Sequence, residues 1–136
     1  MLKTTRLIYL IILVGIVSSS KMAIGQISTN QEIESLICKP WTLKTYEIDG
    51  INQLLDTLSN DRLIFHPDHS LELDLDVEIL NAFWSYDKQT TTITITDAET
   101  KKSLVMKILF LSTNNFTLEA KEENGTFTKI HMITDK

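Results

Sequence analysis

The chain has 136 residues, of which 43% are hydrophobic and 23% charged, and it contains a single cysteine. This length corresponds to one domain, and the hydrophobic content is that of a globular protein rather than a disordered one. One cysteine excludes an internal disulfide, so the core must hold the domain together. The sequence contains no Ser/His/Asp or Cys/His arrangement and no glycine-rich phosphate loop, so we expect neither an enzyme nor a cofactor.

The first 25 residues have the pattern of an export signal. A positively charged start precedes the uncharged apolar run from Leu7 to Val17, and Ala23-Ile24-Gly25 is a small-x-small cleavage site. The run is shorter than the roughly 20 residues that span a bilayer. We therefore predict a signal peptide over 1–25, a mature domain over 26–136, and a periplasmic or extracellular location. An uncleaved N-terminal anchor is the alternative.

Cleavage would make the domain more acidic. The whole chain carries 13 basic and 18 acidic side chains, a net charge of −5. Loss of Lys3, Arg6 and Lys21 leaves 10 basic against 18 acidic side chains, a net charge of −8. Because such a domain is repelled by nucleic acid and anionic lipid, neither is expected as a partner. We also expect no membrane span after cleavage.

The mature chain is predicted to open with a short helix that ends at Pro40. Ile33, Leu36 and Ile37 are spaced at i, i+3 and i+4, and residues 28 and 31, or 29 and 32, are spaced as capping boxes. Cys38 follows the helix. We expect it to be a small buried hydrophobic residue, with a free thiol capable of dimerising as the alternative.

The rest of the chain alternates apolar and polar residues in short runs bounded by turn residues, which is typical of antiparallel strands. Eight strands are expected, at Trp41–Ile48, Arg62–His66, Leu71–Ile79, Phe83–Asp87, Thr91–Thr96, Ser103–Leu111, Phe116–Lys121 and Thr126–Thr134. Most connections are short, so strands that are neighbours in sequence should pair. We predict an all-β fold, an eight-stranded antiparallel meander barrel, with a two-sheet sandwich as the alternative.

One segment between the first two strands interrupts this pattern. Ile51, Leu54, Leu55 and Leu58 are spaced as a single apolar stripe of a helix. We therefore predict a second short helix over Ile51 to Leu58 that packs on the rest of the domain.

Three stretches resemble the lipocalin-like domains of secreted bacterial proteins. They are Trp41 at the start of the first strand, Leu63-Ile64-Phe65-His66-Pro67-Asp68, and Trp84 before a threonine-rich strand; Leu109 to Leu118 also has the family's leucine-rich strand, turn and strand. Pro40 and Phe83 stand where family members usually carry glycine. The resemblance implies a small calyx-like barrel, and many members of the family have no assigned ligand. No functional residue of the family maps onto this chain.

An eight-stranded barrel has an interior just wide enough for side chains or for one small ligand. The first hypothesis is a non-enzymatic domain that binds a small apolar or amphipathic molecule inside the barrel, with the second helix as a lid. The lining or lid would then include Trp41, Leu54, Leu58, Phe65, Leu73, Trp84 and Met106. The alternative is a filled barrel that acts through its surface, as a structural or protein-interaction module of the cell envelope.

Two polar patterns have simpler interpretations than metal binding. His66-Pro67-Asp68-His69, with His131, offers zinc ligands, but Pro67 and Asp68 fit a turn between strands, so we predict no metal site. Glu72, Asp74, Asp76 and Glu78 alternate with apolar residues. Carboxylates at such spacing are about 6.5 Å apart along a strand, too far to chelate calcium together. We predict a solvated outer face with the leucines pointing inward.

The predicted strand Ser103–Leu111 is apolar on both sides. One side carries Leu104, Met106, Ile108 and Phe110, and the other carries Val105, Leu109 and Leu111. A strand of this kind needs cover outside the barrel. We expect the N-terminal helix or a partner subunit to provide it.

Overall fold

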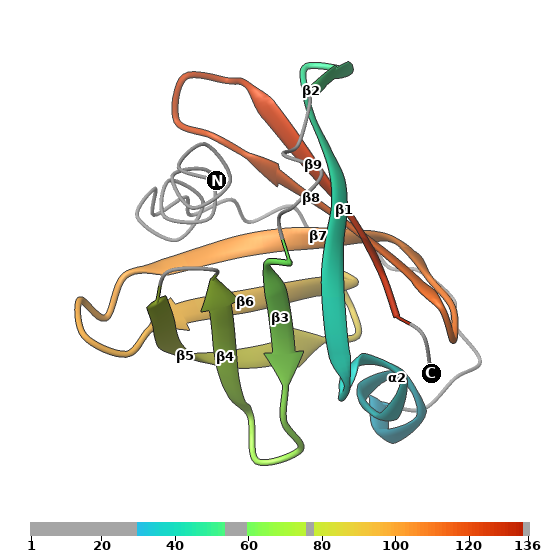
Figure 1. Cartoon of the computed structure of the whole chain (residues 1–136), viewed down its shortest axis with the longest axis vertical. Helices are drawn as coiled ribbons and strands as arrows, with labels where there is room; N and C mark the ends of the chain where they lie inside the picture. Colours follow the sequence, from blue (N-terminus) through green and yellow to red (C-terminus); the bar gives the residue numbers. More distant parts are fainter. Residues whose placement is uncertain (1–29, 54–59, 76–77, 135–136) are drawn as a thin grey trace.

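The computed structural model describes residues 30–53, 60–75 and 78–134, which form a closed antiparallel β-barrel with one short helix (Figure 1). The elements are α2 (Asn30–Ile37), β1 (Pro40–Ile48), β2 (Ile51–Gln53), β3 (Arg62–Phe65), β4 (Ser70–Leu75), β5 (Glu78–Asp87), β6 (Thr92–Asp97), β7 (Ser103–Leu111), β8 (Asn115–Lys121) and β9 (Phe127–Ile133). Helix α2 confirms the predicted N-terminal helix, although the two capping residues proposed for it at 28 and 29 lie outside the described residues. No helix in the described part of the chain is long and apolar enough to cross a membrane.

Strand β1 closes the barrel. The strands pair in the order β2-β1-β3-β4-β5-β6-β7-β8-β9, and β1 also pairs with β9. On one side β1 pairs with β9 from Thr42 to Ile48, and on the other its start pairs with β3 while its end pairs with β2. The predicted eight-stranded barrel is therefore confirmed in β1 and β3 to β9, the sandwich is excluded, and β2 is an additional strand.

The predicted helix over Ile51 to Leu58 is wrong where the structure describes it. Residues Ile51–Gln53 form β2 and pair with β1, so that Ile48 lies opposite Ile51. Asp49 and Gly50, between them, both have positive φ angles of 50° and 80°. Two such residues form the tight turn that matches the twist of a hairpin. The turn returns the chain along β1, and the apolar residues 54, 55 and 58 lie outside the described residues.

The predicted strand Leu71–Ile79 is also wrong, because it spans parts of two strands. Strand β4 ends at Leu75, and the chain has reversed by Glu78, which pairs with Leu75 at the start of β5. The alternation of apolar and acidic residues continues through the reversal and hides it. The predicted faces hold in β4, where Leu71, Leu73 and Leu75 are buried and the acidic residues between them face outward.

The core lies inside the barrel, on the inward-facing alternate residues of the strands. Its buried members include one large residue or more from every barrel strand. Helix α2 adds Ile37, which is fully buried, and Ile33, which packs against the core. Cys38 is half-buried beside this core, and burial raises the pKa of its thiol, with a smaller contribution from Glu34. The helix therefore packs on the barrel as part of its core.

A β-bulge in β7 changes which residues face outward. The pairing with β8 shifts register between Ile108 and Phe110, so Leu109 and Phe110 are 42% and 54% exposed while Leu111 packs against the core. The prediction that Phe110 shares the inward face with Met106 is therefore wrong. Helix α2 also leaves Leu109 uncovered, because it lies beside the start of β1 (Figure 1). Cover by a partner subunit stays a prediction.

Charged side chains alternate in a row across the outer face of β7, β8, β9 and β1. Lys107 lies opposite Glu119, Glu119 opposite Lys129, and Lys129 opposite Glu47. Opposite charges in such cross-strand positions stabilise a sheet modestly. Glu47 also contacts His131, with 2.7 Å between its Oε2 and Nε2 of the imidazole.

This last contact predicts a pH dependence of stability. The hydrogen bond with His131 lowers the pKa of Glu47 below its ordinary value of 4.5, and Lys129 and the charge of His131 contribute less. A lowered pKa stabilises the folded state above pH 4.5, and this contribution is lost as the pH falls through the folded pKa. We expect Glu47→Gln to lower the urea midpoint at pH 7 and to leave it unchanged at pH 2. An equal loss at both pH values would contradict the assignment.

Candidate functional site

Five of the seven predicted lining residues come together inside the barrel. Trp41, Phe65, Leu73, Trp84 and Met106 all belong to the core, and each is at most 2% exposed. The other two, at positions 54 and 58, lie outside the described residues. The five side chains therefore face inward and pack against other core residues, and their role in ligand binding stays a prediction.

Aromatic rings occupy the end of the interior next to α2. The ring centroids of Trp41 and Phe116 are 5.2 Å apart, those of Phe116 and Phe65 are 6.0 Å apart, and those of Phe65 and Trp84 are 5.6 Å apart. The indole Nε1 of Trp41 donates a 2.9 Å hydrogen bond to the carbonyl oxygen of Ile37 in α2. At this end of the barrel the space between the strands is filled by rings in contact.

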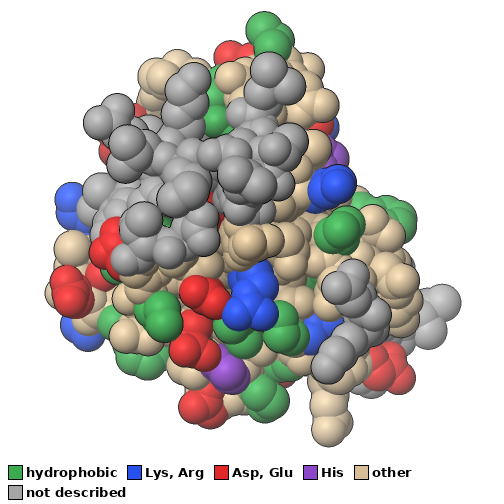
Figure 2. Space-filling model, viewed as in Figure 1, with side chains coloured by type: hydrophobic (Ala, Val, Ile, Leu, Met, Phe, Trp, Pro, Cys, Tyr) green, Lys and Arg blue, Asp and Glu red, His purple; other side chains and the backbone are tan. Residues whose placement is uncertain are grey.

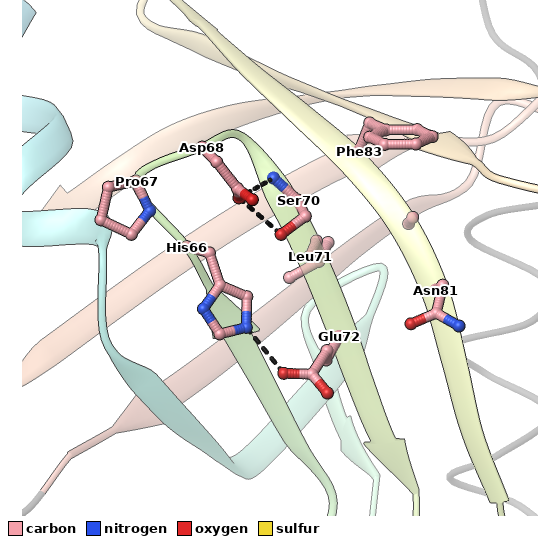
Figure 3. A pocket seen from close by; sticks show the side chains of 9 residues that line it. His66, Pro67, Asp68, Ser70, Leu71, Glu72, Asn81 and Phe83 are labelled. Atoms are coloured by element: carbon pink, nitrogen blue, oxygen red, sulfur yellow. Dashed lines mark hydrogen bonds and ion pairs between the residues drawn. The ribbon is translucent and has the colours of Figure 1, made fainter.

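An open hollow of about 590 Å³ lies on the outer face of β4 and β5, beside the turn between β3 and β4. It is lined by His66, Pro67, Asp68, Ser70, Leu71, Glu72, Asn81, Ala82 and Phe83. In Figure 3 the side chains of β5 lie on one side of β4 and those of the β3–β4 turn lie on the other. Leu71 and Ala82 are core residues of adjacent strands, so the hollow has a firm floor.

The turn between β3 and β4 forms one wall of this hollow. Within it, the amide of His69 donates to the carbonyl of His66, and His69 has a positive φ of 71°. The Ser70 hydroxyl and amide both donate to Oδ1 of Asp68, at 2.6 and 2.9 Å. These bonds, the hydroxyl bond first, lower the pKa of Asp68. Local hydrogen bonds therefore hold the turn in one conformation.

Trp84 connects this turn to the core. Its indole Nε1 donates a 3.0 Å hydrogen bond to the carbonyl of His66, and its backbone amide donates a 2.9 Å bond to the carbonyl of His69. The His69 ring lies against the indole, with 4.7 Å between centroids. A side chain predicted to line the interior therefore also positions the wall of a hollow on the outside.

The polar groups of the hollow are only partly satisfied. His66 Nε2 and Glu72 Oε2 lie 2.6 Å apart (Figure 3). The side-chain amide of Asn81 has no hydrogen bond with any described residue, and its strand neighbour Phe83 is 51% exposed. The ammonium of Lys101 lies 5.9 Å from the centre of the Phe83 ring. The hollow thus combines an exposed aromatic ring with available donors and acceptors.

A second hollow, of about 340 Å³, lies on the same side of the molecule, lined by Asn60, Arg62, Asp74 and Leu75. Its two charged side chains pair with each other at 2.6 Å. The face drawn in Figure 2 shows acidic, basic and histidine side chains close to hydrophobic ones, so no single charge sign dominates it. This second hollow offers no exposed aromatic ring.

The histidines considered as zinc ligands do not assemble. His66 pairs with Glu72, His69 contacts Glu34 at 3.1 Å, and His131 lies on β9 beside Glu47. Among the residues that the structure describes, no three metal-ligating side chains form a group. Each imidazole instead has a carboxylate neighbour.

Asn81 and Phe83 are not among the binding residues predicted from the sequence. Asn81 lies between two predicted strands, because the alternation assigns the start of β5 to the preceding strand. Phe83 carried a usable signal, since it alternates with the inward Trp84 and must therefore face outward. A large apolar residue on the outer face of a strand is a reason to look for a binding surface.

No family model matches this chain, and no curated protein or solved structure matches it. A barrel of this shape does not by itself identify a family. The resemblance to lipocalin-like domains therefore stays a prediction from the sequence.

Proposed function

We propose that this protein is an exported, non-enzymatic binding domain in which the barrel is a scaffold and the hollow over β4, β5 and the β3–β4 turn is the binding surface. The observation that carries the proposal is the contrast between the two faces of β5. Its inward residue Trp84 is buried against the ring of Phe65, whereas its outward residues Asn81 and Phe83 are exposed beside the polar groups of the hollow. This arrangement supports the surface-acting alternative over a ligand carried inside a lipocalin-like barrel.

Physical reasoning favours the outer hollow. A ligand that entered next to α2 would have to separate rings already in contact, and burying these rings stabilises the fold. The outer hollow requires no such rearrangement. Its volume is within the range of roughly 300–1,000 Å³ typical of small-molecule sites, and it has a few convergent polar groups.

The two hypotheses predict different nuclear magnetic resonance shifts. The protein is titrated with laurate as an apolar probe, and with capped dipeptides and disaccharides as polar probes. We expect at least one polar probe to shift the amide signals of Glu72, Asn81 and Phe83. We also expect laurate to leave the methyl signals of Leu73 and Met106 unchanged.

The opposite pattern would overturn the proposal. If laurate shifts the methyl signals of Leu73 and Met106 and no polar probe shifts the amides of the hollow, the barrel carries an apolar ligand. If neither class of probe shifts any signal, the hollow is not a binding surface for small polar molecules and the proposal also falls.

A further inference from the structure

We propose that the hollow binds a neutral saccharide, with one face of a sugar ring against Phe83 and sugar hydroxyl groups bonded to Asn81, His66 and Glu72. The inference rests on the proposed function, because it assigns a ligand class to the same hollow. It follows from the partners of the charged side chains, the hydrogen-bonding groups of the hollow, its exposed phenyl ring and its span.

Each charged side chain at the hollow has a neighbouring partner. Glu72 has His66 within hydrogen-bond distance, and both amide and hydroxyl of Ser70 already donate to Asp68. Lys101 lies near the opposite wall, beside Phe83. An anionic ligand would meet two carboxylates, and a cationic ligand on the Phe83 ring would be repelled by the nearby ammonium of Lys101. A neutral ligand avoids both costs of unfavourable charge.

The remaining hydrogen-bonding groups suit hydroxyls. A hydroxyl donates one hydrogen bond and accepts others, so a site for it needs both kinds of partner. The amide of Asn81 provides both, and it is unbonded among the described residues. Glu72 contacts His66 through Oε2 and has Oε1 as a further acceptor, while His66 has Nδ1 in addition to the contacting Nε2. Together these side chains offer both hydrogen-bond donors and acceptors, from β4, from β5 and from the turn that follows β3.

Phe83 supplies the apolar platform. Its ring is 51% exposed and lies two residues from Asn81, on the same outer face of β5. The face of an aromatic ring carries partial negative charge and attracts the weakly positive C–H groups on the apolar face of a pyranose. The Phe83 ring can thus contact the apolar face of a sugar while the amide of Asn81 bonds to its hydroxyl groups.

The hollow has the span of a short saccharide. His66 follows β3, and Asn81 and Phe83 lie on β5, with β4 between them. Neighbouring strands are about 4.8 Å apart, so the two walls are separated by roughly 9.6 Å. This distance corresponds to two linked sugar rings, so a disaccharide would reach from the Phe83 ring to the His66 and Glu72 pair.

Saturation-transfer nuclear magnetic resonance with cellobiose, maltose, lactose and diacetylchitobiose tests the proposal. We expect at least one of these disaccharides to receive saturation, strongest at the protons of one ring face. Phe83→Ala and Asn81→Ala should each weaken its affinity roughly ten-fold, which corresponds to about 1.4 kcal/mol. Phe110→Ala is the matched control, because Phe110 is equally exposed but lies on the bulge of β7, and it should leave the affinity unchanged.

The outcomes separate this inference from the proposed function. If no disaccharide binds but capped dipeptides shift the amides of Asn81 and Phe83, the hollow is a binding surface and the saccharide assignment is wrong. If a disaccharide binds equally to the wild type, Phe83→Ala and Asn81→Ala, its site is elsewhere and the assignment is also wrong.

Discussion

Replacing Phe116 with alanine is expected to lower the free energy of unfolding by about 3–5 kcal/mol. Phe116 is fully buried, and its ring lies between those of Trp41 and Phe65, at 5.2 and 6.0 Å. Its removal leaves a cavity in the part of the core where three aromatic side chains contact one another. Urea unfolding followed by tryptophan fluorescence measures the loss. Both tryptophans, Trp41 and Trp84, are buried in the core and become exposed to solvent on unfolding.

Two further variants make this prediction specific. Phe110→Ala removes a ring that is 54% exposed, and it should change the free energy of unfolding by no more than about 0.5 kcal/mol. Phe116→Leu keeps an apolar side chain and should cost about 1–1.5 kcal/mol, which keeps the test interpretable if the alanine variant does not fold. Equal losses for Phe116→Ala and Phe110→Ala would show that the rings do not form the core of the fold.

Most of the barrel could be predicted from the sequence because its strands have one buried and one exposed face. In such strands the alternation of apolar and polar residues reports directly on the side chain's direction, as at Leu71, Leu73 and Leu75. Helix α2 could also be predicted from the sequence, since Ile33 and Ile37 are spaced by about one helical turn. Local pattern and tertiary structure agree in these elements.

The errors occurred where local pattern and backbone geometry disagree. The residues of β2 belong to a helical stripe of apolar residues in the sequence, but the turn at Asp49 and Gly50 places them in a hairpin. Asp-Gly is a common hairpin turn, so this dipeptide was the signal against a helix. The reversal between Leu75 and Glu78 interrupts no alternation. The bulge near Leu109 has no glycine to mark it, and one extra residue reverses the direction of all side chains that follow.

The candidate site was harder to predict than the fold because two strands and the turn before the first of them contribute to it. His66 and Asp68 were noticed for their chemistry, yet their hollow exists only because β5 pairs with β4 and brings Asn81 opposite Glu72. Cross-strand register of this kind depends on where each strand begins and ends. Because the predicted strands leave Asn81 between them, the sequence did not predict that it lies opposite Glu72.

Trp84 is the residue through which the core positions the outer hollow. Its ring packs against Phe65 inside the barrel, while its Nε1 and backbone amide bond to the carbonyls of His66 and His69 in the β3–β4 turn. The indole nitrogen donates this bond, and a phenylalanine ring at this position would have no donor to replace it. Changes at Trp84 should therefore affect both stability and the hollow.

Two substitutions at Trp84 separate these effects. Trp84→Ala should lower the free energy of unfolding by about 3–5 kcal/mol, because it removes a buried ring. Trp84→Phe keeps most of the ring but removes one of the two donors to the carbonyl of His66, the other being the amide of His69, and it should cost about 0.5–1.5 kcal/mol. Amide hydrogen exchange at Ser70 and His69 should become faster in Trp84→Phe than in the wild type, and exchange in β8 should not. Unchanged exchange in the turn would show that the indole nitrogen does not hold the wall of the hollow, and that the local bonds between Asp68 and Ser70 suffice.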